Sequence, residues 1–221
     1  MLTVEGLQVS FEKTPVLRGV SLQVGEKEAV ALVGRNGAGK TTLMRAVMGL
    51  VKADSGKVTF DGKELTGLAP NERPAFRIGY MPEDRRLIPD LTVEENILLP
   101  LWALKEKEPE KKLERVYEFL PEVKELASRR ALQLSGGQQK LVALARAVIV
   151  GEKLLLLDEP FEGVAPGLAA RLAEILRHLK EEGISILVSE SDYTHTKGLT
   201  GRTYLLERGE IIDVRENEAS G

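Results

Sequence analysis

The stretch Gly34-Arg35-Asn36-Gly37-Ala38-Gly39-Lys40-Thr41 decides the fold of this chain. Its glycines let successive backbone N–H groups turn inward around an anion, while its lysine and threonine offer a positive charge to phosphate and a hydroxyl to Mg²⁺. An apolar run at 28–33 precedes it and a helical pattern at 41–48 follows it, so it joins a buried strand to a helix N-terminus. This context disfavours the alternative, a glycine-rich turn without a ligand, and predicts a nucleoside triphosphate site.

Two carboxylates follow a second apolar run, at 154–157. This run is typical of a buried strand, and Asp158 and Glu159 lie at its carboxyl end, which is the edge where ligands bind in open α/β sheets. There Asp158 matches the carboxylate that helps to hold Mg²⁺ in phosphate-loop ATPases, and Glu159 could orient an attacking water. Taken alone, the run could also end in a solvated acidic turn before Pro160.

A third stretch, Leu134-Ser135-Gly136-Gly137-Gln138, lies between the first two. It opens a long apolar-periodic segment that reaches about residue 150. Serine followed three residues later by glutamine is also a capping box, so a purely structural interpretation stays open for this stretch by itself.

Read together, the three stretches resemble the motifs of the ATP-binding cassette (ABC) superfamily, and the resemblance covers about residues 2–214. It implies one α/β domain over 1–221: a P-loop NTPase core with an antiparallel β edge and a helical subdomain inserted at about 84–150. It also implies hydrolysis of ATP with Mg²⁺ by a head-to-tail pair of cassettes. In such a pair each phosphate loop faces the partner's signature residues, which are Ser135, Gly136, Gly137 and Gln138.

The resemblance assigns further roles in the site. Phe11 lies where the family usually places an aromatic ring against adenine, although ordinary strand packing is an equally open role. Catalysis would use Glu159, Lys40 and Ser191, and the metal would be held by Thr41, Glu83 and Asp158. The nucleotide would contact Phe11, Val16, Gly34, Arg35, Asn36, Gly37, Ala38, Gly39, Lys40, Thr41 and Thr42.

The chain departs from the family at Glu83, where most cassettes carry glutamine. A carboxylate can still bind Mg²⁺, but it adds a negative charge beside the triphosphate. The sequence resembles the ATPase subunits of bacterial branched-chain amino-acid importers at this glutamate, at Arg85-Arg86, and in the segments 91–96 and 162–166.

A second departure lies at the switch position after the last buried strand, where ABC proteins usually place histidine. When the motifs are matched to those of the family, Ser191 takes this position. Its hydroxyl can donate to phosphate, but the side chain is shorter than that of histidine and carries no charge. His195, four residues later, could take the role or could be an ordinary surface histidine.

Composition narrows the choice of partners. The chain has 31 basic and 34 acidic residues, so no basic excess points to nucleic acid, and the lack of cysteine excludes disulfides and thiolate metal sites. No apolar run approaches the roughly 20 residues needed to span a bilayer, and no leader precedes the first strand. We therefore expect a cytoplasmic protein, peripheral on the inner face of the cell membrane, with transmembrane permease subunits and a second ATPase subunit as partners. The alternatives are an ABC protein serving metal-cluster assembly, DNA repair or translation, and a P-loop kinase.

The spacing of apolar residues and of turn residues along the rest of the chain predicts the order of helices and strands. Strands are expected at 2–11, 16–24 and 57–62, which together form the antiparallel edge, and the next strand should end at 78–82. Helices are expected at 92–103, 110–126 and 166–182, followed by a strand at 184–189, a hairpin of 202–207 with 210–214, and a frayed end from 215. Apolar residues at 87–89 and 97–102 predict a solvent-facing groove for the transmembrane partner, unless Trp102 fills the small core of the insert.

Overall fold

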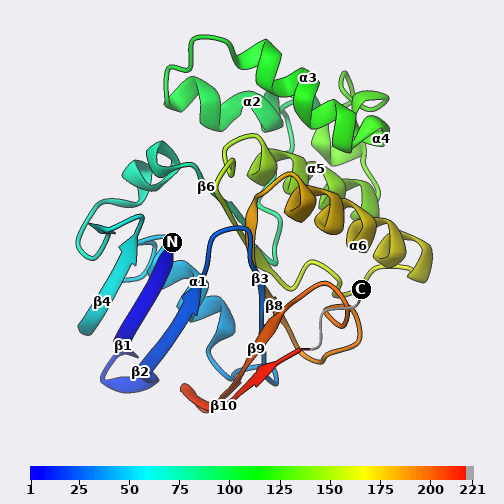
Figure 1. Cartoon of the computed structure of the whole chain (residues 1–221). Coiled ribbons are helices and arrows are strands. Elements are labelled where there is room, and N and C mark those ends of the chain that lie inside the picture. Colours follow the sequence, from blue (N-terminus) through cyan, green and yellow to red (C-terminus); the bar gives the residue numbers. More distant parts are fainter. Residues whose placement is uncertain (218–221) are drawn as a thin grey trace.

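In the computed structural model, which describes residues 1–217, a six-stranded sheet forms the centre of the molecule (Figure 1). Its strand order is β10-β9-β3-β8-β7-β6, and every neighbouring pair is parallel except β10 with β9. The strands are β3 (Ala29–Val33), β6 (Ile78–Met81), β7 (Leu154–Asp158), β8 (Ser185–Glu190), β9 (Arg202–Glu207) and β10 (Glu210–Glu216).

Both faces of this sheet are covered, which explains the uninterrupted apolar runs. Every residue of β3 and β7 is buried. Along β3, Val30 and Leu32 belong to one hydrophobic cluster, and Ala31 and Val33 belong to the other. Such continuous runs are typical of parallel strands that are buried on both sides.

A separate antiparallel sheet, in the order β2-β1-β4-β5, forms the predicted β edge. Helix α1 (Lys40–Val47) contacts this sheet through β1 and β2 and the central sheet through β7. Its Leu43 and Met44 are fully buried. The strands are β1 (Leu2–Phe11), β2 (Thr14–Val24), β4 (Ser55–Phe60) and β5 (Lys63–Glu64).

The opposite side of the central sheet carries the helices, drawn at the top and right of Figure 1. Helix α5 contacts both β6 and α2, so it joins the inserted helices to the sheet. The helices are α2 (Val93–Ala103), α3 (Pro109–Phe119), α4 (Pro121–Lys124), α5 (Gly136–Val148) and α6 (Pro166–Glu181), with short 3₁₀ helices at Pro70–Phe76 and Ala131–Gln133. The fold is therefore the predicted P-loop α/β core with an antiparallel β edge and inserted helices.

Most predicted elements agree with the structure to within two residues at each end, and two differences have a structural explanation. The single helix expected at 110–126 is two helices, because Pro121 has no N–H for a continuing helix and its ring restricts Leu120, whose φ is −131°. Strand β10 continues to Glu216, whose Oε1 lies 2.9 Å from Arg202 Nε, so the predicted fraying at 215 and 216 was wrong. Residues 218–221 of that prediction lie outside the described part.

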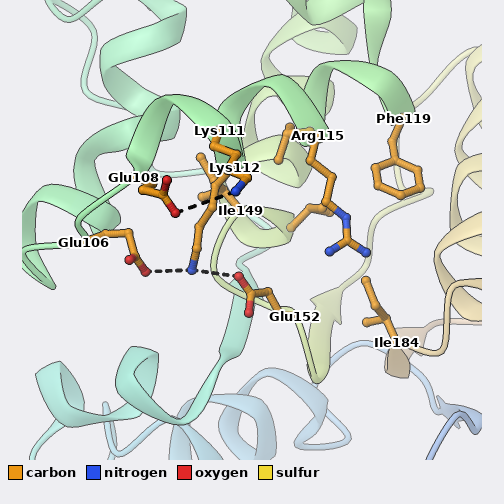
Figure 2. A pocket seen from close by; sticks show the side chains of 11 residues that line it. Glu106, Glu108, Lys111, Lys112, Arg115, Phe119, Ile149, Glu152 and Ile184 are labelled. Atoms are coloured by element: carbon orange, nitrogen blue, oxygen red, sulfur yellow. Dashed lines mark ion pairs between the residues drawn. The ribbon is translucent and has the colours of Figure 1, made fainter.

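Ion pairs connect α3 to the central layer around a small cavity of 280 Å³ (Figure 2). Lys112 Nζ lies 2.7 Å from Glu106 Oε2, and also 2.7 Å from Glu152 Oε1 in the turn before β7. None of the residues that line this cavity belongs to the phosphate loop. Within residues 1–217, none of the helices has the length and apolar character that crossing a bilayer requires.

The predicted apolar groove is present beside α2. Ile88 and Trp102 are 39% and 48% exposed, so part of the segment faces solvent, while Ile97 and Leu101 are buried. Leu99 and Pro100 of the predicted segments line a cavity of 530 Å³, which we call the α2 groove, whereas Ile88 and Trp102 do not line it. The rest of its apolar lining includes Met48, Tyr80, Ala103 and Leu104.

Candidate nucleotide-binding and hydrolysis site

The phosphate loop links the end of β3 to the start of α1. Gly37 and Gly39 have φ of 81° and 113°, a left-handed region that glycine enters without the steric cost of a side chain. Gly39 is the N-cap of α1, and no side chain caps this helix end. The first N–H groups of a helix have no partner within it, so they are available to an anion at this point.

A cavity of 320 Å³ lies over this loop and collects residues from distant parts of the sequence. Its lining consists of Val16, Asn36, Gly37, Gly39, Lys40, Thr41 and Thr42, together with Glu83 and Glu159. Gly34, Arg35 and Ala38 instead line a neighbouring cavity with 205–208. Phe11, at the end of β1, is 47% exposed and is not among the residues of the 320 Å³ cavity, so its contact with adenine stays a prediction.

Thr41 and Asp158, the two residues proposed from sequence as metal ligands together with Glu83, meet beneath this cavity. Thr41 Oγ1 donates to Asp158 Oδ1 at 3.2 Å, and Ser189 Oγ donates to the same oxygen at 2.7 Å. Asp158 is fully buried, and burial raises its pKa, while the hydrogen bonds from Ser189 and Thr41 oppose that rise. Hydroxyl and carboxylate oxygens suit Mg²⁺, which typically takes one or two protein ligands and completes its shell with phosphate and water.

Residues 1–217 contain no cluster of three or more His, Cys, Asp or Glu side chains able to hold a metal ion. A cation held by Thr41 and Asp158 would complete its shell with phosphate oxygens and water.

Glu159 is nearly buried at 5% exposed, and its carboxylate lies beside the phosphate loop. Its Oε1 is 3.0 Å from Lys40 Nζ, and Lys40 also donates to the carbonyl of Arg35 at 3.3 Å. Glu159 has φ of 48°, which is rare for a residue with a side chain. Several contacts must therefore hold its backbone in place.

The structure separates the two candidates for the switch position. Ser191 Oγ donates to Asn36 Oδ1 at 3.0 Å and lies 3.3 Å from Glu159 Oε2. The ring of His195 stacks on Phe161 instead, with centroids 4.9 Å apart. Ser191 is thus the residue that adjoins the phosphate loop and Glu159.

We expect slow ATP turnover that rises several-fold, about three- to tenfold, in Ser191→His, because imidazole reaches farther and can carry a proton to the developing charge. His195→Ala should leave turnover unchanged. Phosphate release at saturating ATP checks both. Loss of hydrolysis in His195→Ala with a silent Ser191→Ala would show that His195 is the switch residue.

The signature residues lie at the N-terminus of α5. Ser135 Oγ accepts from Gln138 N at 3.3 Å, and Gln138 Oε1 accepts from Ser135 N at 3.0 Å, so the predicted capping box is present. Ser135 and Gly136 are exposed, and neither they nor Gly137 and Gln138 line the cavity over their own phosphate loop.

Sequence reasoning missed four residues around the carboxylates. Ser189 and Glu190 end β8 next to the end of β7, and the ligand-binding edge of a parallel sheet is the signal that could have found them. Lys140 stands four residues before Leu144 on the buried face of α5, where an apolar residue is expected. Tyr80, whose hydroxyl lies 3.4 Å from Asp158 Oδ2, gave no distinctive signal.

Glu190 is a buried carboxyl, 6% exposed, that accepts a hydrogen bond from Phe161 N at 3.1 Å. Burial raises its pKa to about 7 from an ordinary value of 4.5. Its contribution to stability is thus complete below pH 4.5 and is lost as the pH rises to about 7, since the unfolded chain ionises first.

Glu190→Gln should remove this pH dependence, because an amide does not titrate. The free energy of unfolding of wild type minus that of Glu190→Gln should fall by about 1 to 3 kcal/mol between pH 4.5 and 7 and stay level above pH 8. Urea unfolding at a series of pH values measures it. A flat difference would show that Glu190 titrates alike in the folded and unfolded chains.

The phosphate loop, the Thr41–Asp158 pair and Glu159 on one edge of a parallel sheet define a P-loop nucleoside triphosphatase. The model of the ABC transporter family matches residues 17–162. The chain belongs to this family and is an ATPase subunit of the ABC type.

Two curated relatives and one solved structure illustrate the similarity. BraG of Pseudomonas aeruginosa, a high-affinity branched-chain amino acid transport ATP-binding protein, is 36% identical over 96% of this chain and 91% of its own. The lipopolysaccharide export ATP-binding protein LptB of Haemophilus influenzae is 35% identical over 96% and 89%. A dimeric post-hydrolysis structure of the cassette MJ0796 with ADP and Pi has a TM-score of 0.88 at 26% identity, over the full length of both chains.

Proposed function

We propose that the chain hydrolyses Mg²⁺-bound ATP at the phosphate loop, with a separate role for each group of residues in the site. Lys40 and the amides of the loop hold the phosphates, Thr41 and Asp158 hold Mg²⁺ with Glu83 nearby, and Glu159 orients the attacking water. The observation that carries this proposal is the convergence of two contacts in one place. Thr41 Oγ1 lies 3.2 Å from Asp158, and Lys40 Nζ lies 3.0 Å from Glu159.

Phosphate release from ATP, without any acceptor molecule, tests this proposal. Release should require Mg²⁺, stop on chelation, and fall in both Thr41→Ala and Asp158→Asn. Transfer of phosphate to a small metabolite would support the kinase alternative instead. Release that persists in both variants would remove Thr41 and Asp158 from the metal site.

A second cassette completes each site in this proposal. Ser135 and Gly136 of the signature are exposed at the N-terminus of α5. In this position they can contact the phosphate loop of another chain. The dimeric form of the MJ0796 cassette with ADP and Pi supports this arrangement. The second chain would be either identical or a paralogue.

The α2 groove is the surface that we assign to the transmembrane permease subunits, which places the chain peripherally on the cytoplasmic face of the membrane. The apolar part of the groove lining, with exposed Trp102 next to its Ala103 on α2, supports contact with an apolar helix. Co-purification from gently solubilised membranes should recover an integral membrane protein, and Trp102→Glu should release it while ATP binding by the isolated chain persists. Purification without any membrane partner would favour the ABC proteins that work away from transporters.

For the transported substrate we propose branched-chain or other hydrophobic amino acids. Glu83, Arg85-Arg86 and the segment 162–166 support this choice, and so does the similarity to BraG. Vesicles that contain the co-purified complex should take up leucine only with ATP. The similarity to LptB makes lipid export the outcome to compare, and ATP-dependent loss of lipid without leucine uptake would replace this choice.

A further inference from the structure

The turn after β7 carries Glu159 in an unfavourable backbone conformation, and the sequence around it does not explain how the turn is held. Glu159 has φ of 48° although it is not glycine. A residue in this region persists only where its surroundings hold it, and such residues cluster at functional sites. Part of the support is local, since Glu159 N donates to the carbonyl and the hydroxyl of Ser189 at 3.1 and 3.2 Å.

Two buried ionisable side chains, one basic and one acidic, hold the rest of the turn. Lys140 on α5, 5% exposed, donates from Nζ to the carbonyl of Glu159 at 3.0 Å and to the carbonyl of Glu162. Glu190 at the end of β8 accepts from the amide of Phe161 at 3.1 Å. The backbone from 159 to 162 is therefore fixed from two different elements, through its carbonyls by a cation and through an amide by a carboxyl group.

Burying ionisable side chains costs folding free energy, and packing alone does not explain why they are present here. Burial lowers the pKa of Lys140, so its protonated form is less favoured at this position than in water. Replacing buried charges with apolar side chains of similar volume is often neutral or stabilising, so the charges need another reason for their presence. Holding the backbone of Glu159 supplies one, because a shift of about 1 Å in a reacting group can slow catalysis a hundredfold.

We propose that Lys140 and Glu190 are positioning residues for ATP hydrolysis, which clamp the turn 159–162 so that the carboxylate of Glu159 is directed at the attacking water. The proposal rests on the role assigned to Glu159 above. Neither residue lines the cavity over the phosphate loop, so both act through the turn.

Lys140→Met tests the clamp because it keeps most of the apolar stem of the side chain and removes its donors. We expect kcat to fall at least about tenfold while the Kd for ATP stays within about twofold, since Lys40 and the loop amides are untouched. Lys140→Arg, which can still donate to two carbonyls, should recover most of the activity. Glu190→Leu should lose about as much as Lys140→Met, and Glu190→Gln, which keeps an acceptor for Phe161 N, should stay close to wild type.

Lys112→Met is the matched control. It removes a partly buried lysine with two polar partners in the insert, and it should lower the melting temperature without changing kcat (Figure 2). If Lys140→Met behaves like Lys112→Met, Lys140 is only structural and the proposal is overturned. Should Lys140→Met fail to fold, Glu190→Leu and Glu190→Gln make the same test from the other side of the turn, and equal kcat in these two variants overturns the clamp.

A double variant separates this inference from the role of Glu159. In the Glu159→Gln background, adding Lys140→Met should cause no further loss in the residual turnover, because the two residues act as one unit. Independent losses that multiply would overturn the clamp while leaving the role of Glu159 intact. Full activity in Glu159→Gln alone would instead refute the proposed role of Glu159, whatever Lys140 does.

Discussion

Lys40→Ala weakens ATP binding by about 1.5 to 3 kcal/mol, roughly a 10- to 150-fold rise in Kd, because it removes charge-assisted hydrogen bonds to phosphate. The cavity has no second cation to compensate, since Lys40 is the only basic residue among those that line it within the described part of the chain. Titration calorimetry with ATP and Mg²⁺ at fixed ionic strength measures the change.

The carbonyl contact of Lys40 with Arg35 and its ion pair with Glu159 require a control for stability. A thermal melt of Lys40→Ala shows whether the fold is retained, and Lys112→Ala, which removes a partly buried lysine elsewhere, should leave Kd for ATP unchanged. An unaltered affinity in a folded Lys40→Ala protein would mean that the loop amides alone bind the phosphates.

The sequence was most informative where a local pattern of residues is compatible with few backbone conformations. The glycine positions of the phosphate loop and the unbroken apolar runs at 29–33 and 154–157 specify their conformation and burial locally, and the structure has them as predicted. The capping box at Ser135 is equally local. Each of these features depends on residues within about ten positions of one another.

The missed features have two causes, one local and one that involves contacts between distant segments. The helix expected at 110–126 breaks at Pro121, a local signal that its helical periodicity masked. The positions of Lys140 and Glu190 carried a signal, but their partners could not be assigned from sequence, because these are backbone groups of a turn about 20 and 30 residues away along the chain. Backbone partners leave no trace in the identity of the contacted residue, so only the folded structure shows them.

Glu159→Gln should stop hydrolysis and preserve binding. An amide keeps the shape of the carboxylate but loses its charge and basicity, so the water step slows by about 10²- to 10⁴-fold while the phosphate contacts remain. Phosphate release and ATP titration, run on the same preparation, measure the two effects separately. Undiminished release would remove Glu159 from the role that we propose for it.

The same variant tests the paired site, because ATP that is not hydrolysed can persist between two chains. Lys40 and Thr41 of one chain and the signature residues of the other would then complete a site that neither builds alone, which links dimer stability to nucleotide. Light scattering should give a monomer without nucleotide and a dimer with ATP for Glu159→Gln. Adding Ser135→Arg should return it to monomer, since the longer side chain crowds the phosphate. The exposed position of Ser135 at the N-cap of α5 makes this change compatible with folding, at the loss of one capping bond. An identical mass with and without ATP in Glu159→Gln would contradict the head-to-tail pair.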